Sequence, residues 1–284
     1  MITNHQDKIS FKMGFINSLL TSVTKITKKK LWAYVINKEQ KFVKPLKKHQ
    51  AEVYDILGMK IIKFTKNQDS KKYIVFFHGG GFVMSGNRRH HNFIINLYKK
   101  TGFTCYYIDY PLAPLYKAVD VINKVEAVVK EIQKQELNKE MILLGDSAGG
   151  NLALVFSKLF PEVKDIILLS PWLDLTMTNP DILTMERKEI MFSKDDLLKA
   201  AKDYKGDLEL DNPLISPIYD NFSDKKIKIL AGTDDFLYPD VLKFVKTYNN
   251  IDLHEYSKLK HDFMFLTGGK EQNQVIDEMA KYLI

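Results

Sequence analysis

A serine between two glycines, at the junction of an apolar run and a helical pattern, constrains the fold of this 284-residue chain more than any other feature. The run MILL (141–144) suits a strand that is covered on both faces, and GDSAGGN (145–151) follows it directly. In the spacing G-x-S-x-G, glycines two residues to either side of Ser147 let neighbouring backbone pass close to a strained strand-to-helix turn. The pattern predicts that Ser147 projects above the edge of a sheet, where a helix N-terminus favours developing negative charge.

Strand-sized and helix-sized patterns alternate after about residue 60. The expected strands are residues 60–65, 73–77, 103–109, 141–144, 165–169, 226–231 and 252–256. The expected helices are residues 88–100, 117–135, 149–160, 238–248 and 271–283. This alternation predicts an α/β fold, with a mostly parallel, doubly wound sheet and helices on both faces. Ligands of such sheets bind at the carboxyl ends of the strands.

Two other stretches are expected to form a helical cap over those strand ends. Residues 1–50 are rich in lysine, and their apolar residues have the spacing of an amphipathic helix. An insertion at about residues 175–215 contains no clear strand, but Ser193 and Asp196 suit the N-cap and third position of a helix. The predicted organisation is an N-terminal cap segment followed by an α/β domain, residues 51–284, that carries this insertion.

A second glycine cluster, HGGGF (78–82), follows the expected strand at residues 73–77. Consecutive glycines after a strand let several backbone N–H groups point to one place, which an acyl-transfer enzyme needs to hold a tetrahedral oxyanion. A flexible turn is the simplest alternative. A phosphate-binding loop is a weaker one, because neither G-x-x-x-x-G-K-[ST] nor G-x-G-x-x-G occurs at this cluster.

A nucleophilic serine needs a base, and the base needs a carboxylate that orients it. Of the seven histidines, His261 is favoured because it lies in a loop after the last expected strand, from which it can reach over the strand ends. His254 lies within that strand and is expected to be structural, whereas His78 is expected to shape the glycine loop.

Three aspartates follow the expected strand at residues 226–231. Asp234 and Asp235 stand at the end of this strand, whereas Asp240 suits the first turn of the next helix. The residues alone leave the choice between Asp234 and Asp235 open. The chain order of serine, aspartate and histidine is that of α/β-hydrolases.

The sequence resembles the hormone-sensitive-lipase-like family of α/β-hydrolase carboxylesterases over residues of about 70–265. The segments that carry this resemblance occur in the family's order: HGGGF (78–82), DYPLAP (109–114), GDSAGGN (145–151), SPWLDLT (170–176), NPLISP (212–217), GTDDFLYPD (232–240) and HDF (261–263). The resemblance implies the α/β-hydrolase fold. It also implies the site residues, which are Ser147 as nucleophile, His261 as base, Asp235 as acid, and Gly80, Gly81 and Ala148 as oxyanion-hole donors.

The sequence departs from the family pattern in three places. Asp262 replaces the glycine that usually follows the histidine, which is expected to alter the histidine loop. The family's Asp-Pro-Leu at the acid is DFL (235–237) here, so the choice between the two aspartates stays open. The stretch after YPLAP (110–114) is shorter than usual, and residues 1–50 match the family's cap only in position.

Together these features predict a serine carboxylesterase that acts through an acyl-enzyme, and the resemblance implies short to medium acyl esters as substrates. The same triad could serve an amidase or deacetylase of a small molecule, and a hydrolase fold without activity could serve as a binding protein. The predicted reaction needs no cofactor and no metal ion. The single cysteine, Cys105, is expected in the core and excludes a thiolate metal cluster.

The chain carries a formal net charge of +7, but only three of its 42 basic residues are arginines. Because nucleic-acid recognition depends strongly on arginine, this composition predicts a solvated lysine-rich surface and no nucleic-acid partner. The basic helix that ends at residues 28–30 is expected to cover the core, with weak contact to an anionic membrane surface as the alternative. No signal peptide and no apolar run of about 18 residues is recognisable, so we expect a cytoplasmic protein. The expected partner is a small-molecule ester, and no feature specifies an oligomeric state.

Overall fold

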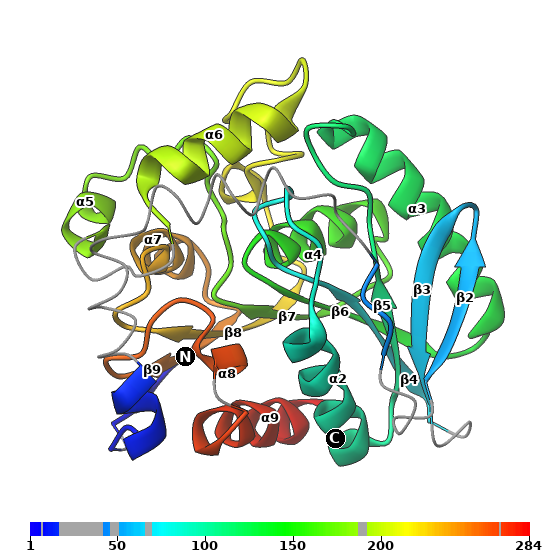
Figure 1. Cartoon of the computed structure of the whole chain (residues 1–284), viewed down its shortest axis with the longest axis horizontal. Coiled ribbons are helices and arrows are strands. Elements are labelled where there is room, and N and C mark those ends of the chain that lie inside the picture. The colour runs from blue at the N-terminus through cyan, green and yellow to red at the C-terminus, as the bar shows by residue number, and fades with distance from the viewer. Residues whose placement is uncertain (7, 17–41, 46–50, 66–69, 187–191, 267) are drawn as a thin grey trace.

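A computed structural model describes the chain at residues 1–6, 8–16, 42–45, 51–65, 70–186, 192–266 and 268–284. Within these ranges the strands form one nine-stranded sheet, in the order β1-β9-β8-β7-β6-β4-β5-β3-β2 (Figure 1). The strands are β1 Ile2–His5, β2 Glu52–Ile56, β3 Met59–Phe64, β4 Lys72–Phe77, β5 Thr104–Ile108, β6 Glu140–Asp146, β7 Asp165–Leu169, β8 Lys226–Gly232 and β9 Ile251–Tyr256. The helices are α2 Arg88–Thr101, α3 Ala118–Gln135, α4 Ala148–Leu159, α5 Asp181–Glu186, α6 Lys194–Lys205, the 3-10 helix Pro217–Tyr219, α7 Tyr238–Thr247, α8 Phe263–Leu266 and α9 Lys270–Leu283.

Strands β4 and β6 lie side by side in the sheet, where the direction of chain progression reverses. The chain leaves β4 through α2 to reach β5 on one side, and it returns through α3 to reach β6 on the other side. Along the sheet, all neighbouring strands in the series β1-β9-β8-β7-β6-β4-β5 are parallel. Strands β3 and β2 add an antiparallel hairpin at the edge next to β5. The loops after β4 and β6 therefore meet at a topological switch point, which is where sheets of this kind bind ligands.

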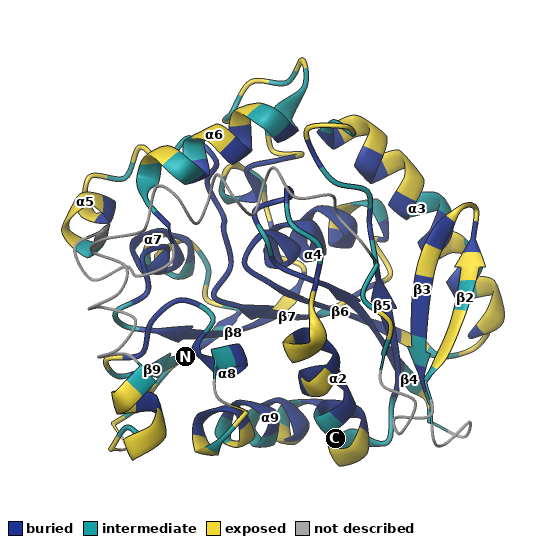
Figure 2. Ribbon diagram, viewed as in Figure 1, coloured by how far each residue is buried: buried dark blue, intermediate teal, exposed yellow. Residues whose placement is uncertain are grey.

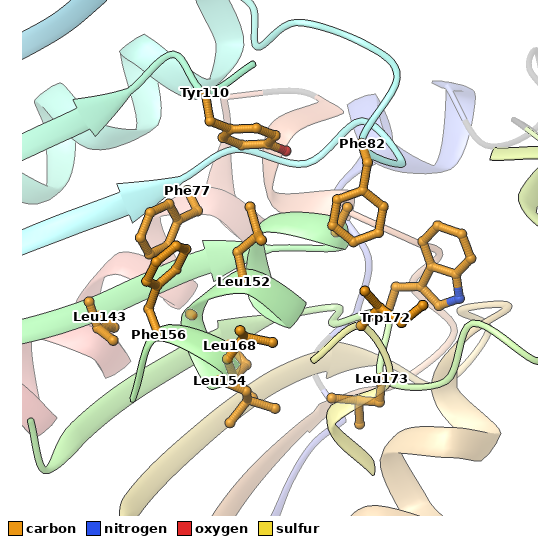
Figure 3. Close-up of a cluster of buried hydrophobic side chains, with 14 of the residues drawn as sticks. Phe77, Phe82, Tyr110, Leu143, Leu152, Leu154, Phe156, Leu168, Trp172 and Leu173 are labelled. Carbon is orange, nitrogen blue, oxygen red and sulfur yellow. The ribbon is translucent and has the colours of Figure 1, made fainter. Parts of the chain in front are cut away.

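Helices cover both faces of the sheet, as predicted. The buried residues of α3, α4 and α7 pack on one face and those of α2 and α9 pack on the other (Figures 1 and 2). On the first face, Phe77 of β4 stacks on Phe156 of α4 with 5.1 Å between the ring centroids, and Leu143 and Leu168 lie beside them (Figure 3). Burial of these apolar side chains on both faces explains why the central strands read as continuous apolar runs. The predicted α/β, mostly parallel, doubly wound sheet is confirmed.

The N-terminal segment differs from the helical expectation for residues 1–50. Ile2–His5 form a strand that pairs in parallel with β9, with Ile2 opposite Leu253, so the helical expectation is wrong for this stretch. The open edge of β9 presents N–H and C=O groups that an extended segment satisfies, and this outweighs the helical pattern of the region. A helix follows at residues 11–16. Residues 17–41 and 46–50 lie outside the described residues, so the remainder of the N-terminal cap stays a prediction.

The insertion at about residues 175–215 carries α5 and α6, and its described part contains no strand. Helix α6 begins as predicted, because Ser193 Oγ accepts a hydrogen bond from the Asp196 N–H at 3.2 Å and Asp196 Oδ2 accepts one from the Ser193 N–H at 2.8 Å. The ring of Tyr204 in α6 stacks on Phe82 with 3.9 Å between centroids. Since Phe82 closes the glycine cluster after β4, α6 packs directly over that loop.

Replacing the N-cap of α6 tests how much this capping box contributes. We expect Ser193→Ala to lower the free energy of unfolding by about 1 kcal/mol, because the Asp196 N–H loses its acceptor. Urea unfolding followed by circular dichroism measures this change. Ser193→Thr keeps a hydroxyl acceptor and serves as the control, and equal stability of the alanine and threonine variants would contradict the expectation.

Candidate active site

Ser147 occupies the turn between β6 and α4 with a backbone φ of 50° and ψ of −117°. A non-glycine residue in this region is strained by about 1 to 3 kcal/mol, so the turn needs support from its surroundings. Two backbone hydrogen bonds supply it, because the Ser147 N–H donates to the Leu169 carbonyl at 2.9 Å and the Trp172 N–H donates to the Ser147 carbonyl at 3.0 Å. The side chain is therefore held at the carboxyl edge of the sheet.

The glycines on either side of Ser147 are required by close backbone contacts. A Cβ atom on Gly145 would lie 2.1 Å from the carbonyl oxygen of Gly149, and one on Gly149 would lie 2.0 Å from the carbonyl oxygen of Phe77. Both distances are far below van der Waals contact with backbone atoms that cannot rotate away. The G-x-S-x-G spacing thus reflects how closely α4 approaches β4 and β6.

His261 lies between Ser147 and Asp235, although these residues come from three separate loops. Its Nε2 is 3.0 Å from Ser147 Oγ, and its Nδ1 is 3.0 and 3.1 Å from the two carboxylate oxygens of Asp235. A carboxylate only accepts hydrogen bonds, so Nδ1 carries a proton and Nε2 faces the serine. Asp235 is fully buried and is held in turn by the Leu237 N–H, which donates to it at 2.8 Å. The arrangement can move a proton from Ser147 to His261.

The glycine cluster lies beside this serine. Gly80 and Gly81 follow β4 with positive φ angles of 124° and 60°, a conformation that suits glycine. Both line the same cavity as Ser147 and His261. Ala148 is the first residue of α4, so its N–H has no acceptor within the helix. In the described part of the chain, no backbone hydrogen bond is donated by the N–H of Gly80 or Gly81.

A cavity of about 260 Å³ opens above Ser147. The insertion contributes Phe192 and Leu197 to its wall, and α2 contributes Arg89. The Phe192 ring meets the His261 ring edge to face, with 5.2 Å between centroids. The insertion therefore covers the histidine as well as the glycine loop, and the cavity offers apolar walls with a cationic group in its lining.

The other candidate histidines occupy structural positions. His78 is fully buried, its Nδ1 is 2.7 Å from the Gly79 carbonyl oxygen, and its ring stacks on Tyr110. Burial lowers the pKa of His78 to about 3, so this side chain is neutral and supports the glycine loop. His254 lies within β9 with its Nε2 2.6 Å from Lys228 Nζ, at the sheet edge that β1 completes.

Asp240, a second candidate carboxylate, binds the insertion. Its Oδ1 accepts a hydrogen bond from Asn179 Nδ2 at 2.8 Å, which ties α7 to the start of the insertion. Asp234 precedes the carboxylate that contacts His261, and its N–H donates to the Leu259 carbonyl. Of the three aspartates in this segment, Asp235 is the one that lies at Nδ1.

Sequence reasoning missed a group of buried ionisable residues next to Ser147 and His261. Asp262 Oδ2 lies 3.2 Å from His261 Nε2, and Asp146 Oδ2 lies 3.3 Å from His90 Nε2. The replacement of the family's glycine by Asp262 was the only available signal, and it predicted an altered loop without predicting this contact. The motif spacing gave no sign that His90 of α2 pairs with Asp146.

Asn151 connects α4, the helix that follows Ser147, to both ends of the insertion. Its Nδ2 donates to the carbonyl of Trp172 at 2.9 Å and to the carbonyl of Ile215 at 2.7 Å. Trp172 precedes the insertion and Ile215 closes it. The helix that begins directly after Ser147 therefore also holds both ends of the insertion.

No cluster of three or more His, Cys, Asp or Glu residues in the described ranges has the geometry to hold a metal ion. No helix in the same ranges combines the length and the apolar character that crossing a membrane requires.

Comparison with known proteins shows esterase and lipase relatives of this chain within the alpha/beta hydrolase fold family. A family model described as the alpha/beta hydrolase fold matches residues 74–265. An esterase of Acinetobacter venetianus is 28% identical in an alignment of 231 positions that covers 76% of this chain and 76% of the esterase. A triacylglycerol lipase of Mycobacterium tuberculosis is 27% identical in an alignment of 180 positions that covers 60% of this chain but only 35% of the lipase.

Solved structures show the same fold at low sequence identity. A hormone-sensitive lipase from a metagenome library superposes with a TM-score of 0.78 at 21% identity, covering 95% of this chain and 97% of that one. A hormone-sensitive-lipase homologue, also from a metagenome library, gives a TM-score of 0.80 at 20% identity, with 97% and 98% covered. The fold likeness thus extends over nearly the whole chain, beyond the segment that the family model matches.

The contact between Gly149 and β4 can be tested by adding one methyl group. We expect Gly149→Ala to lower the free energy of unfolding by about 3 kcal/mol, because the new Cβ would press on the Phe77 carbonyl. Gly14→Ala is the matched control, since nothing lies within 4 Å of a Cβ at that position. Thermal unfolding of both variants measures the difference, and a Gly149→Ala protein as stable as the control would contradict the expectation.

Proposed function

Because this chain belongs to the alpha/beta hydrolase fold family, in its esterase and lipase branch, we propose that it is a serine carboxylesterase with Ser147 as its nucleophile. The contact that carries the proposal is the 3.0 Å distance between Ser147 Oγ and His261 Nε2, with Asp235 on the opposite nitrogen. This is the arrangement that general-base activation of a hydroxyl requires.

The acylation step follows from these positions. Ser147 Oγ attacks the carbonyl carbon of an ester while His261 Nε2 takes the hydroxyl proton, and the carbonyl electrons move onto oxygen. The N–H groups of Gly80, Gly81 and Ala148 are the donors we assign to this oxyanion, with the N-terminus of α4 adding a favourable field. His261 then gives its proton to the leaving alkoxide, and the alcohol departs to leave an acyl-serine.

Deacylation repeats the same proton path. His261 takes a proton from water, the hydroxide attacks the acyl-serine, and the proton passes to Ser147 Oγ as the acid leaves. Asp235 keeps Nδ1 protonated and stabilises the imidazolium in both steps. A cavity of about 260 Å³ is small for a ligand site, which supports short to medium acyl esters as the substrates. The reaction as proposed draws on no cofactor.

Removal of the nucleophile tests the proposal directly. We expect Ser147→Ala to lower kcat for p-nitrophenyl butyrate by about 10⁶, because no other hydroxyl lies at His261 Nε2 in the described residues. A fluorophosphonate probe should label the original protein and fail to label the variant. Ser223→Ala, at an exposed serine, is the control and should keep full activity. Retention of most of the activity by Ser147→Ala would exclude the proposed mechanism.

The identity of the acid can be decided by two neighbouring substitutions. We expect Asp235→Asn to lower kcat/KM by about 10⁴, because the amide would favour the wrong tautomer of His261. Asp234→Asn changes the same charge one residue earlier and should lower it by less than about tenfold. Initial rates with p-nitrophenyl acetate compare the two variants, and the reverse order of effects would assign the role to Asp234.

A further inference from the structure

Asp262 places a second carboxylate at the reacting nitrogen of the proposed base. Its Oδ2 lies 3.2 Å from His261 Nε2, while Ser147 Oγ lies 3.0 Å from the same atom. The Asp262 backbone has a φ of 52°, in the left-handed region that favours glycine, and its N–H donates to Ser170 Oγ at 3.3 Å. An aspartate thus holds a strained position here, with its side chain directed at the catalytic centre.

The contact between Asp262 and His261 depends on how many protons the two side chains hold. With Nδ1–H donated to Asp235, a neutral His261 offers only a lone pair at Nε2. That lone pair and an ionised carboxylate would repel each other at 3.2 Å, so the contact with Asp262 is stable only when one more proton is present. The proton resides either on Nε2 or on the Asp262 carboxyl, and in both cases Nε2 is unable to accept the proton of Ser147.

The surrounding charges keep this proton within the pair. Burial lowers the pKa of His261, but the carboxylates of Asp262 and Asp235 outweigh it and raise that pKa well above its usual range. Burial raises the pKa of Asp262 to about 6, although His261 acts in the opposite direction. Asp146 at the end of β6 adds a further negative charge on the same side.

Helix α2 contributes Arg89 and His90 to the surroundings of the pair. His90 faces Asp146 through Nε2, while its Nδ1 accepts a hydrogen bond from the Asn87 N–H at 3.0 Å, so a neutral ring satisfies both contacts. Arg89 lines the same cavity as Asp262. Asp262 Oδ1 is buried and makes no hydrogen bond to the described part of the chain. Burial lowers the pKa of His90, but the charges of Asp146 and Asp262 outweigh this effect and raise that pKa above its usual value.

We propose that Asp262 is a positioning residue that shares one proton with His261, competes with Ser147 for Nε2, and delays hydrolysis until that proton leaves as the pH rises. This inference rests on the proposed esterase function. The base acts only when it is neutral, so a carboxylate that favours the protonated ring moves the rise of activity to higher pH. At high pH the same charge strengthens the base and stabilises the imidazolium that forms when Ser147 attacks.

The test compares pH profiles of kcat/KM for the original protein, Asp262→Asn and Asp262→Gly. Asparagine preserves the shape of the side chain and tolerates a positive φ, whereas glycine removes the side chain and relieves the backbone strain. A shift that both variants share therefore comes from the lost charge and not from a change in the loop. We expect the acidic limb of both profiles to move down by about one pH unit or more. Below the original limb the variants should be faster by about tenfold for each unit of this shift, and at the alkaline plateau they should be no faster than the original protein.

Controls separate this contact from overall charge and from loss of structure. Asp277→Asn removes an exposed carboxylate on α9 and should leave the profile unchanged, and thermal unfolding checks that all variants are folded. The pH dependence of fluorophosphonate labelling reports the ionisation of His261 without any substrate and should move with the kinetic limb. Superimposable limbs in folded variants, or an equal shift in Asp277→Asn, would overturn the inference. If Ser147→Ala remains active, the proposed function itself fails, which is a different result.

Discussion

Helix α4 approaches strand β4 so closely that a methyl group on Gly149 would lie 2.0 Å from the carbonyl oxygen of Phe77. This contact brings the first turn of the helix against the loop that contains the glycine cluster. It also leaves Ser147 no room for a relaxed turn, so the residue adopts its positive φ and directs its side chain above the sheet. The nucleophile candidate and the proposed oxyanion donors are therefore adjacent because two glycines permit two backbones to meet.

The acid and base proposed for Ser147 lie in loops that follow strands in the other half of the sheet. Asp235 follows β8 and His261 follows β9, and both strands run parallel to β6, so all three loops open at the same edge. Burial makes every charge at this edge expensive unless it is paired. Asp235 meets that requirement through His261 and the Leu237 N–H, whereas Asp262 contacts His261 with Oδ2 and leaves Oδ1 without a hydrogen bond within the described residues. This difference makes the second carboxylate sensitive to a single proton.

Much of the fold could be predicted because apolar runs and turn residues are local signals. The central strands are buried on both faces, so their runs were visible in the sequence, and the Ser193 capping box was recognisable from its spacing. The edge strand Glu52–Ile56 is mostly exposed and gave no such run, and Ile2–His5 became a strand only because β9 offered a free edge. Pairing between distant segments of this kind has no local signature.

The residues of the candidate site also differ in whether a local sequence signal identified them. Ser147 and His261 were identified from motif spacing and chain order, whereas the choice between two adjacent aspartates depended on which side chain the turn after β8 directs inward. The contact between Asp262 and His261 was hidden for a related reason. A substitution is visible in a sequence, but the direction of a side chain on a left-handed residue follows from the packed loop. The catalytic roles of these residues, and the division into cap and main domain, stay predictions.

The two hydrogen bonds of Asn151 fix both ends of the insertion at one place. The carbonyls of Trp172 and Ile215 accept these bonds from one amide side chain, in the first turns of α4. Between those two points the insertion contacts the candidate site through Tyr204, which stacks on Phe82, and Phe192, which packs on His261. A substitution in this cover therefore changes the wall of the pocket, while Asn151 still holds both ends of the segment on α4.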